Sequence, residues 1–155
     1  MYSDTITLFN RRKEENGVIW YPTILRNVDL NADRGAIIAK YGEQSTDTAS
    51  LHVKFSRSED GAVIIGHDGE GNEIRKKYHP PKEWRGLEDF SGTITFQDGN
   101  EFDFFAVGAW ADEPVPELNY VDGLYAYMNR KYDHVYAITS VAKYSVIPHF
   151  EILAR

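Results

Sequence analysis

Two runs of alternating apolar and polar residues flank a short polar stretch within residues 93–110. The stretch is Asp98-Gly99-Asn100, and glycine and asparagine tolerate the positive φ that hairpin loops require. A two-residue loop would pair apolar residues with acidic ones, whereas a three-residue loop pairs apolar residues with each other. The pattern therefore predicts a hairpin with a three-residue loop. The predicted pairs are Phe96 with Phe102 and Ile94 with Phe104.

This hairpin should have one buried face and one solvent face, because side chains alternate along a strand. Phe96, Phe102 and Phe104 fall on the face that we expect to be buried. Glu101 and Asp103 fall on the opposite face, two residues apart, a spacing that acid–base catalysis can use. A solvated hairpin face explains the two carboxylates more simply, so we expect both to face water.

Further strands are predicted by alternation and by β-branched residues. They cover residues 4–9, 18–29, 51–55, 62–65, 135–141 and 146–153. Asn16-Gly17 is a strong hairpin signal between the first two strands, and Pro22 indicates an edge or a bulge in the second. Residues 135–141 are partly apolar on both sides, which predicts a central strand. Pro148 predicts that the last strand is an edge strand.

One amphipathic helix is predicted over residues 119–132. Its apolar residues recur at helical spacing and form one stripe. The stripe consists of Val121, Leu124, Tyr125, Met128 and Tyr132. Asn119 suits the N-terminal cap, and Arg130 and Lys131 suit the last turn because of the helix dipole. Such a stripe is typical of a helix that packs on a sheet.

Residues 31–42 fit two different structures. A helix could begin at a cap formed by Asn31 and end at Gly42. A strand could equally follow a turn at residues 33–35. The β-rich neighbouring segments favour the strand.

Together these elements predict a mainly β domain, a β-sandwich or barrel, with one amphipathic α-helix near residues 119–132. A length of 155 residues is typical of one domain. No internal repeat, low-complexity segment or interdomain linker is present in the sequence. We therefore expect residues 1–155 to form a single β-rich domain.

Composition narrows the classes of function. The net charge of −7 argues against a nucleic-acid-binding surface, which is normally basic. The absence of cysteine excludes disulfides, thiolate catalysis and cysteine-based zinc sites. No apolar run approaches the roughly 18–20 residues of a membrane span, and the first residues do not resemble a secretory signal. We expect a protein that is cytosolic where it is made and that binds no membrane.

Residues that could support catalysis or hold a metal form no recognisable motif. The five histidines stand singly, at positions 52, 67, 79, 134 and 149. Metal-ligand spacings, a nucleophile elbow and a phosphate-binding glycine loop are all lacking in the sequence. Residues 68–73 have the composition of part of a calcium loop without its ligand spacing, so an exposed turn is favoured. We expect no enzyme activity, no catalytic residue, no metal and no cofactor.

Residues 78–84 combine two prolines with large aromatic side chains. Pro80-Pro81 predicts an extended segment without backbone donors. One interpretation is a rigid connector whose rings cover the core. The other is a docking surface, because tyrosine and tryptophan are frequent interface hot spots. The candidate interface consists of Tyr78, Pro81 and Trp84, with residues 43–48 as a loop that becomes ordered on assembly.

Six stretches of the sequence stand out together: TITLFN at residues 5–10, WYPT at 20–23, YHPPKEW at 78–84, YMNRKYD at 127–133, ITSV at 138–141 and IPHFEI at 147–152. They resemble a family of small structural proteins of tailed phages and prophages, described as head–tail joining, head-closure or minor capsid proteins. The resemblance spans most of the chain, and its motifs are structural rather than catalytic.

The resemblance implies a β-barrel or sandwich subunit that assembles as a homo-oligomeric ring between portal, neck and tail proteins, without a cofactor. It implies a location in the virion, and in the host cytoplasm during assembly. Ten tyrosines and three tryptophans fit a protein rich in contact surfaces. The acidic net charge fits a ring around a channel through which DNA passes without being bound.

A second hypothesis is a host-side β-domain that binds a small ligand or a carbohydrate. Trp20, Trp84 or Trp110 would then stack on the ligand, within a concave apolar pocket that carries a few polar groups. An assembly subunit is expected instead to present a flat or protruding aromatic patch.

Overall fold

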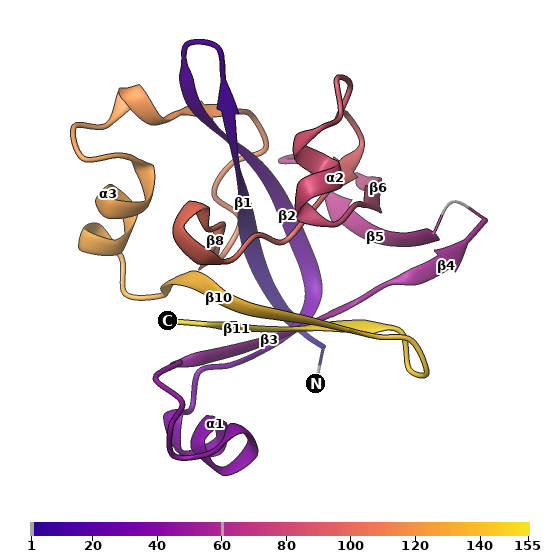
Figure 1. Ribbon diagram of the computed structural model, residues 1–155, viewed down its shortest axis with the longest axis vertical. Helices are drawn as coiled ribbons and strands as arrows, with labels where there is room; N and C mark the ends of the chain where they lie inside the picture. Colours follow the sequence, from indigo (N-terminus) through magenta and orange to yellow (C-terminus); the bar gives the residue numbers. More distant parts are fainter. Residues whose placement is uncertain (1, 60) are drawn as a thin grey trace.

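Six antiparallel strands of the computed structural model pair in a closed ring and form a β-barrel (Figure 1). The structure describes residues 2–59 and 61–155. Each barrel strand pairs on both sides over part of its length, so the mainly β fold class is confirmed in its barrel form. In spatial order the strands are β1 (Asp4–Glu14), β8 (Phe104–Val107), β10 (Val135–Tyr144), β11 (His149–Ala154), β3 (Ala49–Lys54) and β2 (Gly17–Asn31).

β1 and β2 form a long hairpin, drawn in indigo and purple in Figure 1. Its turn ends at Gly17 with φ +122°, which confirms the predicted Asn16-Gly17 turn. Pro22 pairs with β1 and lies between the parts of β2 that pair on the other side with β9 (Val115–Pro116) and β5 (Gly61–His67). Pro22, which has no N–H, therefore lies where β2 pairs with β1 alone among the described strands, as a residue does at the edge of a sheet.

Further strands extend the sheet from β2 beyond the barrel. β5 continues into β6 (Glu73–Tyr78), which pairs in parallel with the short β7 (Thr93–Ile94). β4 (Ser56–Ser58) pairs with β5. The strands predicted at residues 51–55 and 62–65 correspond to β3 and β5.

Residues 31–42 contain a helix, α1 (Arg34–Tyr41), so the favoured strand is wrong. Asp33, not Asn31, caps the helix, because its side chain accepts hydrogen bonds from the backbone N–H groups of Gly35 at 2.9 Å and Ala36 at 3.4 Å. Gly42 follows the helix with φ +97°, as the helical alternative requires. The Asp33 side chain favours the helix over the strand, because it satisfies backbone N–H donors in the first helical turn.

The helix predicted over residues 119–132 is present but shorter, as α3 (Leu124–Lys131). Gly123 precedes it with φ +91°, and the Glu117 carboxylate, not Asn119, accepts the Leu124 N–H at 2.6 Å. Val121 lies before the helix and is exposed instead of belonging to the buried stripe. None of the helices in the described ranges has the length and apolar character that crossing a membrane requires.

Two hydrophobic clusters lie on the two sides of the barrel wall. Phe105 faces the interior cluster, while Phe104 and Ala106 face an outer cluster beneath α3, drawn in orange beside the barrel in Figure 1. β8 is therefore buried on both faces, which explains its continuous apolar run. The outer cluster consists of Phe9, Trp20, Phe104, Ala106, Leu124, Met128 and Val135.

The hairpin predicted over residues 93–110 does not form in the expected register. β7 pairs with β6, whereas β8 pairs with β1 and β10, and a 3-10 turn at Gly99–Glu101 joins the two segments. Phe96 lies in the interior cluster and Phe104 in the outer one, so they do not share a face. Phe102 is only partly buried. Pairing with distant strands replaces the local hairpin.

Asp103 is fully buried, which corrects the expectation that it faces water; Glu101 is exposed as expected. The Asp103 carboxylate accepts hydrogen bonds from Asn10 Nδ2 at 2.8 Å and from the backbone N–H of Arg11 at 2.7 Å. It also accepts from the Gln97 backbone N–H at 2.8 Å and from Gln97 Nε2 at 2.7 Å. These donors satisfy the buried carboxylate and join β1 to the segment before β8.

β10 pairs with both β8 and β11, so the predicted central strand is confirmed. β11 pairs with β10 and β3, so the predicted edge strand is wrong. Pro148 precedes β11 and therefore removes no donor from its pairing. Barrel closure gives the last strand a second neighbour that the sequence does not indicate.

Candidate functional site

β2, β3 and β11 place a row of polar side chains on the outer face of the barrel. Asp29, His52 and Glu151 are direct partners across the three strands. The alternate residues on these strands, such as Leu51 and Phe150, are buried in the interior cluster. Strand alternation therefore sends the apolar side chains inward and leaves the polar ones outside.

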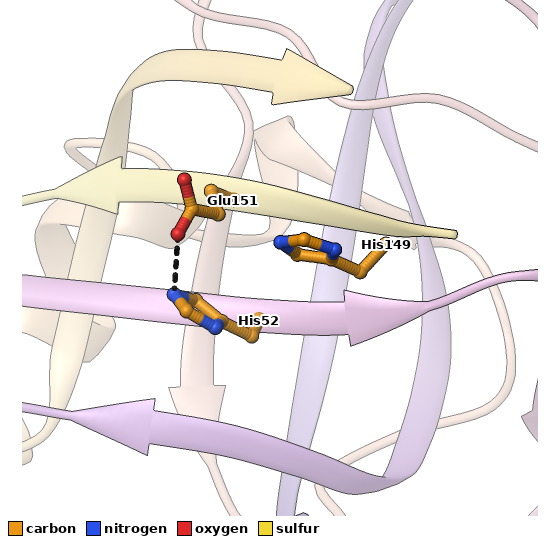
Figure 2. Close-up of side chains that lie close together, drawn as sticks. All are labelled: His52, His149 and Glu151. Atoms are coloured by element: carbon orange, nitrogen blue, oxygen red, sulfur yellow. Dashed lines mark ion pairs between the residues drawn. The ribbon is translucent and has the colours of Figure 1, made fainter. Parts of the chain in front are cut away.

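His52, His149 and Glu151 form the strongest candidate site, which we call the His-Glu cluster (Figure 2). His52 Nε2 lies 3.1 Å from Glu151 Oε1. The rings of His52 and His149 lie 5.5 Å apart between centroids. One atom from each of the three side chains lies within 4.8 Å of the other two. All three side chains are partly buried.

Lys40, from the last turn of α1, is the cation nearest to the carboxylate, with Nζ 2.6 Å from Glu151 Oε1. Burial opposes ionisation of Glu151, but hydrogen bonds from Lys40 and Tyr144 outweigh it and lower the pKa of this carboxyl group. The same hydrogen bond to Glu151 raises the pKa of Lys40. Glu151 is therefore a carboxylate at neutral pH.

The two histidines are held in different ways. His149 Nδ1 lies 2.6 Å from the Ile147 carbonyl oxygen, which can only accept, so Nδ1 carries a proton, and in the neutral ring the lone pair is on Nε2. The His149 ring also stacks on Tyr144, with centroids 5.0 Å apart. Burial lowers the pKa of His52, which favours the neutral imidazole. Figure 2 shows a ring nitrogen of His149 turned toward Glu151 and His52.

Two imidazoles and one carboxylate can share a proton or hold a cation. Sequence reasoning missed the site because it treated the histidines as single residues. His149 and Glu151 do stand two apart on a predicted strand, which places them on one face, and that signal was available. The partner on β3 was not predictable, because it depends on the pairing of β3 with β11.

The predicted interface residues do not form one exposed aromatic surface. Residues 81–85 form a short helix, α2 (Pro81–Arg85), so the extended segment is wrong: Pro80 precedes the helix and Pro81 occupies its first turn, where a missing N–H is tolerated. Trp84 is only 1% exposed, and its Nε1 donates to Thr93 Oγ1 at 2.9 Å.

Burial of Trp84 agrees with the connector interpretation, in which the ring covers the core. Tyr78 is partly buried and packs on Phe150, with ring centroids 4.6 Å apart. Pro81 is partly exposed. The interface role of Tyr78, Pro81 and Trp84 stays a prediction, but Trp84 does not offer an exposed ring.

Two other loops considered from the sequence have clear local contacts. The Asp68 carboxylate accepts hydrogen bonds from the backbone N–H groups of Glu70 and Asn72, both at 2.9 Å, so residues 68–73 form the predicted exposed turn. In residues 43–48, Asp47 Oδ1 accepts the Thr139 hydroxyl at 2.6 Å. Ordering of that loop on assembly stays a prediction.

The tryptophans offer little support for stacking on a ligand. Trp20 and Trp84 are buried, whereas Trp110 is 41% exposed and packs on Tyr132. A cavity of about 560 Å³ lies elsewhere, between β2, β3, β5 and the turn before β11. The aromatic platform and the cavity of the ligand-binding hypothesis are therefore in different places.

Comparison with known proteins places the chain in a family. A model of a family of unknown function, DUF6751, matches residues 1–155. The chain belongs to the DUF6751 family. No curated protein and no solved structure matches the chain.

Proposed function

We propose that this DUF6751 chain is a structural subunit of a tailed-phage particle, of the head–tail joining, head-closure or minor capsid type. It acts through protein–protein contacts with portal, neck or tail proteins and with copies of itself in a ring. The stretches that resemble such proteins lie in β1, β2, the end of β6, α2, α3, β10 and β11 and in the turn before β11. They therefore belong mainly to the barrel and to the helices packed on it.

An exposed aliphatic tip between β10 and β11 is the observation that carries this proposal. Val146 is 96% exposed and Ile147 is 75% exposed. Aliphatic side chains gain roughly 1.5–3 kcal/mol when they are fully removed from water. Ile147 belongs to the IPHFEI stretch, whose Phe150 and Ile152 are buried in the barrel. Packing within the chain leaves Ile147 mostly in water, and contact with another protein would bury it.

A second exposed aliphatic pair lies in the segment between β9 and α3. It consists of Leu118 and Val121. Figure 1 shows this segment and the turn between β10 and β11 on opposite sides of the barrel. Apolar side chains at two separated places suit a subunit that contacts more than one neighbour, as a subunit of a ring does.

Complementation in the phage or prophage that encodes the chain tests this proposal. Deletion of the gene is expected to leave filled heads and free tails, counted by electron microscopy, and the intact gene should restore infectious particles. The double variant Val146→Ser and Ile147→Ser should not restore them, although its melting temperature should stay close to that of the parent.

The control variant is Glu70→Ser, which changes an exposed residue in the turn between β5 and β6. It should restore infectious particles fully. Normal particle yield after gene deletion would contradict the proposal, as would a gene neighbourhood without portal, capsid or tail genes. Normal yield with the double variant would show that the tip is not the contact surface.

A further inference from the structure

We propose that the His-Glu cluster is a binding site for a divalent transition-metal cation of the Zn²⁺ class. The three ligands are the imidazoles of His52 and His149 and the carboxylate of Glu151. This site does not rest on the phage-particle proposal, because its three ligands lie on the outer face of β3 and β11. Two nitrogen ligands and one oxygen ligand match the donors that zinc takes, and they leave one position for water.

The backbone supports this donor set. His149 and Glu151 are two residues apart on β11, so they project from the same face, and His52 is the direct partner of Glu151 on β3. At zinc–ligand distances near 2.0–2.1 Å, tetrahedral ligand atoms lie roughly 3.3 Å apart. His52 Nε2 and Glu151 Oε1 already lie 3.1 Å apart. The three ligand atoms lie within 4.8 Å of one another, so a modest side-chain movement would bring them to this spacing.

Protonation also suits a metal. A metal-binding histidine needs a free lone pair, and its other ring nitrogen usually donates to a carbonyl or carboxylate. His149 has this arrangement, because Nδ1 donates to the Ile147 carbonyl and Nε2 is left free. His52 must move its Nε2 proton to Nδ1, so that a shared metal replaces its hydrogen bond to Glu151.

Lys40 is the group that opposes the metal. Its ammonium lies 2.6 Å from the Glu151 oxygen that faces His52, so it occupies the charge position that a cation would take. The Lys40 side chain is 52% exposed and is attached to the last turn of α1, so it can turn into solvent. Asp29, opposite His52, adds a second negative charge near the site. Metal binding is therefore an exchange of Lys40 for the cation.

Calorimetric titration of the purified, tag-free chain with Zn²⁺ tests the site. We expect one site per chain, a rise in melting temperature with Zn²⁺, and no response to Mg²⁺, which prefers oxygen ligands. His52→Gln and His149→Gln should each weaken Zn²⁺ binding roughly tenfold or more. Lys40→Met should tighten it several-fold, because the competing charge is removed.

His134→Gln is the matched control, since His134 is exposed and directly precedes β10, whose far end carries Tyr144. It should leave Zn²⁺ affinity unchanged. Lys40→Met alters an exposed side chain, so it keeps the test available even when a histidine variant fails to fold. Absence of one-site binding overturns the proposal, as do unchanged affinities in the His52 and His149 variants or weaker binding in Lys40→Met.

Discussion

Two carboxylates of this barrel lie in opposite surroundings. Asp103 is fully buried, and its four hydrogen bonds come from uncharged N–H groups of Asn10, Arg11 and Gln97. Glu151 lies on the outer face, and its partners are side chains that can turn away or change protonation state. The first carboxylate is fixed by backbone and amide donors, whereas the second can exchange its partners.

The pKa values of the two groups move in opposite directions. Burial raises the pKa of Asp103 to about 7, although its four donors favour the charged form. Burial also acts on Glu151, but hydrogen bonds from Lys40 and Tyr144 dominate and lower its pKa. Asp103, which is buried and held by uncharged donors, is therefore a structural group. Glu151, which lies beside charged partners at the surface, stays ionised and available for binding.

The largest expected effect follows from removing the buried acceptor. Asp103→Ala leaves four buried N–H groups without it, and each unsatisfied group costs about 1–3 kcal/mol. We expect the free energy of unfolding, measured by urea denaturation, to fall by about 4 kcal/mol or more. Glu101→Ala changes the exposed neighbour and should stay within about 0.5 kcal/mol of the parent. Similar stabilities for the two variants would remove the distinction.

Trp84→Ala tests how far the buried region extends. Arg85 of α2 donates to Gln97 Oε1 at 2.7 Å, so this helix supports the Asp103 network. Truncating the buried Trp84 should lower the free energy of unfolding by about 3–5 kcal/mol. Truncating the exposed Lys82 on the same helix serves as the control. A folded Trp84→Ala protein of parental stability would show that the ring is not part of the core.

The dependence of stability on pH separates the two carboxylates. The folded state binds the Asp103 proton more tightly than the unfolded state, because the pKa rises from 3.8 to about 7. Asp103 therefore contributes most stability below its ordinary pKa, and this contribution declines as pH rises through about 7. Glu151 acts in the opposite sense, since its lowered pKa contributes stability that is lost as pH falls through the folded value.

Urea denaturation of the parent and of Asp103→Asn between pH 4 and 8 measures the Asp103 contribution. As pH rises across the range in which Asp103 ionises, the unfolding free energy of the parent should fall steadily relative to that of the variant. Parallel curves would show that Asp103 does not titrate in this range.

The smallest effect is expected at the surface carboxylate. Glu151→Gln removes the charge that pairs with Lys40 and His52 but keeps a polar side chain of similar size. Partly exposed ion pairs contribute about 0–1 kcal/mol, so the unfolding free energy at pH 7 should fall by no more than about 1 kcal/mol. A loss comparable to that of Asp103→Ala would mean that Glu151 is a structural carboxylate as well.

The alternation of apolar and polar residues predicted the positions of most barrel strands, because successive side chains of a strand lie on its two opposite faces. It failed at Asp103, because the alternation of side chains along a strand cannot show that Asn10 and Gln97 donate hydrogen bonds to this carboxylate in the interior. It also placed Phe96 and Phe104 on one face, because a local hairpin was assumed where each segment pairs with a distant strand.

The His-Glu cluster was only half predictable. The spacing of His149 and Glu151 follows from strand geometry, but His52 is distant in sequence and reaches them through the β3–β11 register. The aliphatic tip was hidden for another reason. Val146 and Ile147 were included in a predicted strand, although the strand begins after Pro148 and leaves both side chains in the turn.

Closure of the barrel by β11 has a consequence for synthesis on the ribosome. β3 pairs with β11 along its full length, yet residue 154 is translated 100 residues after Lys54. At about 5–20 residues per second, roughly 5–20 s pass between the two. During this interval β3 carries an unpaired edge, which is a template for aggregation. Nascent chains stalled before His149 should therefore be protease-sensitive and bound by chaperones, and the released 155-residue chain should be protected.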